Sequence, residues 1–227
     1  DPVYLLFALP GLLLGLIASG LTKHTFARYA KVRASSGLTG ADAAARMLTQ
    51  AGVRGVTIEP TQGVLSDHYD PRSHTLRLSP DVYFSDSLAA TGVACHEAGH
   101  ALQHAQEYGP LTLRTAMVPL TQLGSNFSYI LFFAGLLLRL PPLIYLGILL
   151  FCLAVLFTLV TLPVEWDASV RAKRALITAG VVTPAEQSDA AAVLNAAFLT
   201  YVASAVSAVL TLLYYLMRSG LLGGRRS

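Results

Sequence analysis

The stretch LIYLGILLFCLAVLFTLVTL, residues 143–162, decides the fold, because its 20 residues include no charge. A helix of that length spans about 30 Å, the thickness of the hydrocarbon core of a bilayer. Over the whole chain of 227 residues, 54% are hydrophobic and only 13% are charged, about half the charged share of a soluble domain. The composition therefore predicts a membrane protein and excludes a disordered chain and an ordinary cytosolic enzyme.

Three further apolar runs predict membrane-spanning helices, at residues 3–21, 117–138 and 196–217, which makes four spans in all. We expect the run 3–21 to be retained in the protein, because it lacks the basic start and the cleavage site of a signal peptide. The sequence Arg139-Leu140-Pro141-Pro142 breaks the chain tightly between the second and third spans. Residues 117–162 are therefore predicted to form a helical hairpin.

The basic residues predict the orientation in the membrane. Twelve of the 16 Lys and Arg lie in segments 22–116 and 163–195, and four lie on the opposite side. The positive-inside rule then places both segments in the cytoplasm and both termini outside, in a bacterial plasma membrane. The net charge of +3 is too small to predict binding to nucleic acid. Cys95 and Cys152, the two cysteines, are predicted to be free thiols.

Segment 22–116 carries most of the charge and is predicted to be a small α+β portion outside the bilayer. Thr39 is a suitable N-cap for a helix over 41–50. Strands are predicted at 56–58 and 75–79, with a turn at Asp70-Pro71-Arg72 between them. A second helix is predicted from about residue 87 to 106, and Gly109-Pro110 ends it.

The motif HExxH lies in that second helix, at His96-Glu97-Ala98-Gly99-His100. On a helix, His96 and His100 lie one turn apart on one face, so both imidazoles can reach a single metal ion. Glu97 lies about 100° further around the helix, where it can reach a water molecule at the metal without binding the ion itself. The small residues between them allow another element to pack closely. The motif therefore predicts a zinc site with Glu97 as general base.

A third ligand is needed, because catalytic zinc usually has three protein ligands. Glu165 is the best candidate: the hairpin crosses the membrane twice and returns the chain to the face of the HExxH helix. This prediction requires the helix that begins near residue 143 to extend past the lipid boundary. Asp167 is the alternative ligand. His104 is unsuitable, because it lies about 12 Å from His96 along a straight helix.

Several stretches in order make the chain resemble the YugP-type membrane zinc metallopeptidases over nearly its whole length. They are TGA (39–41), LSDHYDPR (65–72), HEAGHALQHA (96–105), LPVEWDAS (162–169), LNAA (194–197) and YVA (201–203). The resemblance implies a mainly α membrane protein, in which four transmembrane helices carry a small α+β, gluzincin-like zinc peptidase portion.

The same resemblance implies that Zn²⁺ is bound by His96, His100 and Glu165 and that Glu97 is the general base. Many gluzincins carry an acidic residue four positions after the ligand Glu. This chain has Ser169 at that position, and Asp167 is an alternative for the role.

The predicted function is that of a membrane-bound zinc metalloendopeptidase, which hydrolyses peptide bonds with zinc-activated water at the membrane surface. Its substrates are polypeptides, membrane proteins among them. His68, Asn195 and Tyr201 are candidates to stabilise the oxyanion. The strand at 75–79 is a candidate edge to which an extended substrate pairs, an interpretation that is compatible with its being an internal sheet strand.

Two alternatives stay open at this point. A non-catalytic zinc-binding membrane scaffold or carrier would bind the ion but would have no need of Glu97. An intramembrane protease of the site-2 type would bury the HExxH motif in a spanning helix and take an Asp from a later one. Residues 87–106 are too polar for that arrangement, and no LDG-like motif follows them.

Overall fold

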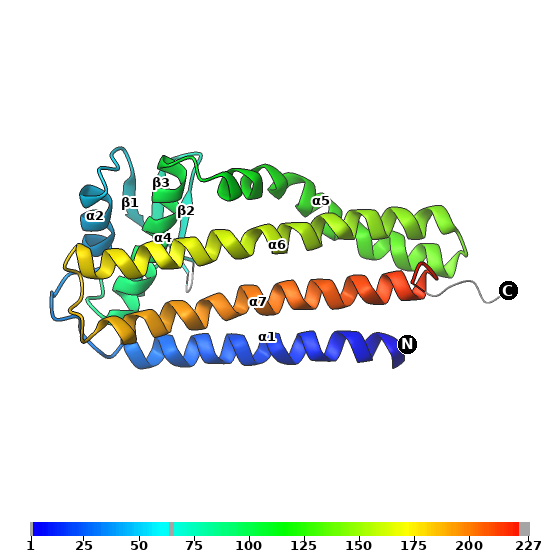
Figure 1. Ribbon diagram of the computed structural model, residues 1–227, viewed down its shortest axis with the longest axis horizontal. Coiled ribbons are helices and arrows are strands. Elements are labelled where there is room, and N and C mark those ends of the chain that lie inside the picture. The colour runs from blue at the N-terminus through cyan, green and yellow to red at the C-terminus, as the bar shows by residue number, and fades with distance from the viewer. Residues whose placement is uncertain (1, 64–65, 223–227) are drawn as a thin grey trace. The chain divides into compact units, whose positions relative to one another are not determined.

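The computed structural model describes residues 2–63 and 66–222 of the chain. Leu65 of the LSDHYDPR stretch and the arginines at 225 and 226 lie outside these residues. The described chain is mainly helical, with one small sheet (Figure 1), as the sequence predicts. The elements are α1 (Pro2–Tyr29), α2 (Gly40–Gln50), β1 (Thr57–Pro60), β2 (His68–Asp70), β3 (Thr75–Leu78), α3 (Pro80–Tyr83), α4 (Leu88–Ala105), α5 (Gly109–Leu137), α6 (Pro141–Thr178) and α7 (Gln187–Arg218).

Three of these helices, α1, α6 and α7, are long and apolar enough to cross a membrane. Helix α5 is bent by 42° between Gly109–Gln122 and Gly124–Leu137, and the two segments together form a fourth candidate span. The described residues therefore contain three candidate spans, or four if α5 counts as one.

The described residues form two compact units. The apolar unit consists of residues 2–18, 112–163 and 200–222, and the α+β unit consists of residues 19–63, 66–111 and 164–199. Helices α1, α5, α6 and α7 each contribute residues to both units. Cys95 in the α+β unit and Cys152 in the apolar unit are free cysteines.

Aromatic side chains form the core of the apolar unit. Phe132 of α5 stacks on Tyr215 of α7 with ring centroids 3.8 Å apart, and Phe151 of α6 packs against the same tyrosine. Helices α5 and α6 approach closely at Gly147, where a Cβ atom would lie 2.7 Å from the backbone nitrogen of Phe132. Small residues allow this kind of close packing between membrane helices.

The sheet of the α+β unit has the strand order β1-β3-β2. β3 pairs in parallel with β1 and antiparallel with β2, and its residues Leu76 and Leu78 are fully buried. The prediction that the strand at 75–79 offers an edge to a substrate is therefore wrong: β3 is the central strand, and neighbouring strands occupy both of its edges. The predicted turn at 70–72 connects β2 to β3, and Asp70 accepts a hydrogen bond from the backbone of Arg72.

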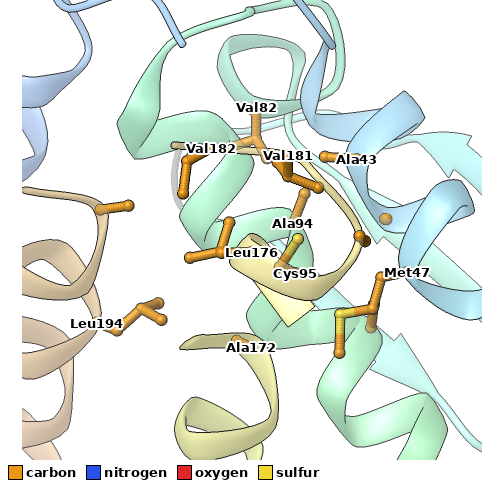
Figure 2. Packing of buried hydrophobic residues seen from close by; sticks show 14 of the residues in the cluster. Ala43, Met47, Val82, Ala94, Cys95, Ala172, Leu176, Val181, Val182 and Leu194 are labelled. Atoms are coloured by element: carbon orange, nitrogen blue, oxygen red, sulfur yellow. The ribbon is translucent and has the colours of Figure 1, made fainter. Parts of the chain in front are cut away.

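Side-chain caps begin the two predicted helices of this unit. Thr39 and Asp42 form a reciprocal capping box at the start of α2, and the Ser87 side chain accepts a hydrogen bond from the backbone of Ala90 at the start of α4. Figure 2 shows the core that these helices share with α6 and α7. Cys95 of α4 and Leu176 of α6 are labelled there among the buried side chains. This core fixes α4 against the second half of α6.

Helix α6 continues through Pro163 as far as Thr178. The uncharged run 143–162 is thus followed by 16 more helical residues. This confirms the requirement that the third predicted span extends beyond its apolar run, and it brings Glu165 into the α+β unit.

Candidate metal centre

Three ligand atoms converge between α4 and α6 within the α+β unit. The Nε2 atom of His96 lies 3.1 Å from Oε2 of Glu165, and Nε2 of His100 lies 3.5 Å from the same oxygen. The two imidazole rings meet edge to face, with centroids 4.9 Å apart. Ligand atoms of the three residues all lie within 4.8 Å of one another, as in a group that can hold a metal ion.

These separations fit a tetrahedral zinc ion. Ligand atoms bound at about 2.0–2.1 Å to a tetrahedral zinc are separated from one another by about 3.3 Å. The measured separations of 3.1 Å and 3.5 Å lie on either side of that value. Two imidazole nitrogens and one carboxylate oxygen are ordinary zinc donors, and a set of three leaves the fourth position for water or substrate.

A glycine allows the two helices that carry the candidate ligands to approach each other. A Cβ atom on Gly99 would lie 2.7 Å from the carbonyl oxygen of Ala168, which is a backbone atom of α6. Gly99 is next to His100, and Ala168 is one turn after Glu165. This contact therefore sets the distance between the histidines of α4 and Glu165 of α6.

The centre is largely shielded from solvent. Only 1% of Glu165 and 8% of His100 is exposed. Burial by itself lowers the pKa of His100, but the hydrogen bond and the negative charge of Glu165 outweigh it, so the pKa of His100 lies above its ordinary value. Burial raises the pKa of Glu97, and the nearby imidazoles of His100 and His96 offset only part of that rise. Glu97 therefore holds a proton more readily than an exposed carboxylate would.

Each histidine has a side-chain partner at its other ring nitrogen. Nδ1 of His96 lies 3.1 Å from the hydroxyl oxygen of Ser169, and Nδ1 of His100 lies 3.0 Å from Oε1 of Gln103. Hydrogen bonds of this kind hold a ligating imidazole in one orientation and one tautomer. Ser169, at the position where the resemblance to gluzincins implies an acidic residue, thus contacts His96 through a hydroxyl.

Asp167 is not part of the cluster of three ligand residues. Its carboxylate accepts hydrogen bonds from the Gln103 amide and from the Arg171 guanidinium. His104 contacts the sheet instead, where its Nδ1 atom lies 2.9 Å from the hydroxyl of Tyr69.

The oxyanion candidates lie on two different elements, β2 and α7. His68 is exposed on β2, and its Nδ1 atom lies 2.8 Å from the carbonyl oxygen of Ser66. Asn195 is exposed on α7 and accepts a hydrogen bond from the Lys173 ammonium group. Tyr201 also lies on α7, in the residues that belong to the apolar unit. Their role in the reaction stays a prediction.

Sequence reasoning overlooked Gln103 and Arg171. A signal for Gln103 was present, because a residue three positions after His100 lies on the same face of a helix. Arg171 likewise lies one helical turn after Asp167. Neither spacing identifies a partner on another helix, so the sequence alone gives these residues no role.

Comparisons with known proteins agree with this geometry. Residues 4–220 match the family described as "Putative neutral zinc metallopeptidase". The chain is 47% identical over 195 residues to the "Putative membrane protease YugP" of Bacillus subtilis (strain 168), an overlap of 86% of this chain and 87% of that protein. No solved structure matches the chain. The resemblance that the sequence motifs suggest is confirmed.

Proposed function

The chain belongs to the neutral zinc metallopeptidase family, and from that premise we propose that it is a membrane-bound zinc endopeptidase. His96, His100 and Glu165 bind the zinc ion in this proposal, and Glu97 is the general base. The observation that carries the proposal is the approach of two Nε2 atoms to one buried carboxylate oxygen, at spacings that suit zinc.

A zinc ion at this position would supply Lewis acidity toward a water molecule and toward the scissile carbonyl. The protein's own residues supply the rest of the chemistry. Glu97 takes a proton from the attacking water and later gives it to the leaving amine. Ser169 and Gln103 hold the two imidazoles in orientation through their Nδ1 atoms.

The change Glu97→Gln tests whether the site is catalytic. We expect this variant to bind zinc as the wild type does, because residue 97 is not a ligand, but to lose at least about 100-fold in peptide cleavage, because general-base catalysis contributes 10²–10⁴-fold. Zinc content by elemental analysis and cleavage of a fluorogenic peptide, both on protein in nanodiscs, measure the two properties.

The same experiment decides between the enzyme and a zinc-binding scaffold. If the Glu97→Gln protein binds zinc and the wild type cleaves no peptide in a broad peptide library, the scaffold is the better account. The matched control is Glu107→Gln, which removes a carboxylate just after α4, outside the cluster of ligand residues.

We further propose that an extended substrate pairs with β2, because β3 has no free edge. β2 contacts α4, the helix that carries the HExxH motif, and β2 is an edge strand of the described sheet. Main-chain pairing along such an edge reads the extended shape of a peptide more than its side chains.

The substrates are polypeptides at the membrane surface, and the site lies on the cytoplasmic side. The first part rests on α6, which continues from its apolar run to Glu165 as one helix. The second rests on the distribution of Lys and Arg. A peptide anchored to the bilayer should be cleaved faster than the same peptide free in solution, and equal rates would contradict the membrane preference. Protease accessibility of segment 22–116 in inverted and right-side-out vesicles tests the orientation.

A further inference from the structure

A single buried amide connects the two helices that carry the ligands. Gln103 of α4 is fully buried, with 0% of its surface exposed. Its Nε2 atom donates to the carbonyl oxygen of Val164 and to Oδ2 of Asp167, at 2.8 Å each. Its Oε1 atom lies 3.0 Å from Nδ1 of His100. Gln103 therefore contacts one ligand directly and the backbone next to another, since Val164 precedes Glu165.

The partners of Gln103 determine which way its amide points. Both neighbours of Nε2 are oxygen atoms that only accept hydrogen bonds. The reversed amide would place Oε1 against these two oxygens and would lose two hydrogen bonds of a side chain that has no exposed surface. Because Oε1 must then face His100, Nδ1 of that imidazole carries the proton and donates it. In the neutral imidazole, the lone pair of His100 is consequently on Nε2, the atom that faces Glu165.

A second layer of contacts holds Asp167 in place. Its Oδ2 atom accepts from Nε of Arg171, one helical turn further along α6. Arg171 also donates from Nη1 to the side chain of Gln106, and its guanidinium lies 5.7 Å from the ring centre of Tyr108. Arg171 is thus anchored to the residues that follow α4, and it fixes the carboxylate that orients Gln103.

We propose that Gln103 is a positioning residue for the metal centre, and that Asp167 and Arg171 act through it. Gln103 selects the His100 tautomer whose Nε2 can bind zinc, and it ties α4 to α6 beside both His100 and Glu165. This inference rests on the proposed zinc site. The inference goes further than the proposed function, because it makes the zinc affinity depend on three connected side chains. These are Gln103, Asp167 and Arg171, and Arg171 is not next to a ligand.

The test is zinc affinity, measured by competition with a chromophoric chelator on the full chain in nanodiscs. The variants are made in the Glu97→Gln background, so that self-cleavage does not occur. We expect Gln103→Leu to bind zinc 10–100-fold more weakly, as is typical when the partner of a ligating histidine is removed. The matched control is Gln50→Leu, because Gln50 also donates across two helices, from α2 to the carbonyl oxygen of Thr178, but has no contact with a ligand. An unchanged affinity in Gln103→Leu would overturn the proposal.

A second pair of variants keeps the test decisive if Gln103→Leu does not fold. Asp167→Asn retains an oxygen that accepts from Gln103, whereas Asp167→Leu does not. We expect the Asn variant to bind zinc nearly as well as the parent protein and the Leu variant to bind it more weakly. Equal affinities in the two variants contradict the role of Asp167. The absorption spectrum of bound Co²⁺ shows whether all three ligands still bind the ion. If Asp167 had a purely structural role, its substitution would leave that spectrum unchanged.

The outcome separates this inference from the proposed function. If the parent protein itself binds no zinc, the proposed function fails. If the parent binds zinc, the wild type cleaves peptides, and Gln103→Leu behaves as its control does, only the positioning role fails.

Discussion

The two halves of α6, on either side of Pro163, use their polar side chains in opposite ways. In the first half, Thr158 and Thr161 donate to carbonyl oxygens of their own helix. In the second half, polar side chains at every other position bond to residues outside the helix. These are Glu165, Asp167, Ser169, Arg171 and Lys173. One continuous helix therefore serves first as an apolar span and then as a scaffold for the site.

The spacing in the second half explains how one helix makes so many contacts. Glu165 and Ser169 lie one turn apart and contact the imidazoles, while Asp167 and Arg171 lie one turn apart on another face and contact two glutamines. In the first half, by contrast, a polar group that bonds to its own backbone leaves nothing unsatisfied in lipid. The comparison indicates that the side chains that can take part in a metal site follow the residue where the apolar run of α6 ends.

The largest effect should come from removing Glu165, the proposed ligand in the second half. Glu165→Gln keeps the volume of the side chain but removes its charge. We expect zinc affinity to fall by more than about 100-fold, beyond the loss caused by removing a partner of a ligand, and cleavage to become undetectable. Chelator competition and the peptide assay measure both.

The matched change in the first half is Thr161→Val, which removes a buried hydroxyl whose hydrogen bond stays within the helix. It should leave zinc binding and cleavage unchanged. A similar loss in both variants would mean that the halves of α6 do not differ in function as proposed.

Much of this contrast can be predicted from the sequence. The run 143–162 predicts a span from its length, and the spacing of His96 and His100 predicts a ligand pair on one face. The strand β2 was overlooked, because three residues are too few to show an alternating pattern. The function of Gln103 was also beyond reach, since its partners on α6 lie 61 and 64 positions away in the chain. The sequence does not specify such pairings until the helices are packed.

A smaller effect is expected from Gly99→Ala, at the contact between α4 and the second half of α6. The new methyl group would meet the Ala168 carbonyl, so α4 must move away from α6 and separate the histidines from Glu165. We expect the free energy of unfolding to fall by about 1–3 kcal/mol, as in other overpacked interiors, and zinc affinity to fall with it. Thermal unfolding and chelator competition are the measurements.

Gly147→Ala makes the equivalent change in the first half, against the backbone of Phe132. It should cost similar stability but leave zinc affinity normal. If Gly147→Ala weakens zinc binding as much as Gly99→Ala does, metal binding responds to general instability and not to the distance between α4 and α6.

The smallest effect concerns the loop that follows the second half of α6. There, Glu186 accepts hydrogen bonds from the backbone and hydroxyl groups of both Ser35 and Thr183. Burial tends to raise the pKa of Glu186, but these hydrogen bonds outweigh it and lower the pKa to about 2, from an ordinary value of 4.5. Because the folded-state pKa is the lower one, the stabilisation is complete above pH 4.5 and is lost as the pH falls through about 2.

Glu186→Gln should therefore lower the melting temperature at pH 7, by less than about 3 °C, because the half-buried residue is still partly screened by solvent. Thermal unfolding of chelator-treated protein from pH 7 down to pH 3 is the measurement, and removing the metal first prevents zinc release from distorting the profile. The difference between wild type and variant should shrink below pH 4.5, because the Glu186 carboxylate of the unfolded chain then binds a proton, while the folded one stays ionised until the pH approaches 2. A difference that stays constant or grows with acid would show that the loop is held by contacts other than the Glu186 charge. The polar contacts after Pro163 would then matter for the metal centre alone and not for the fold around it.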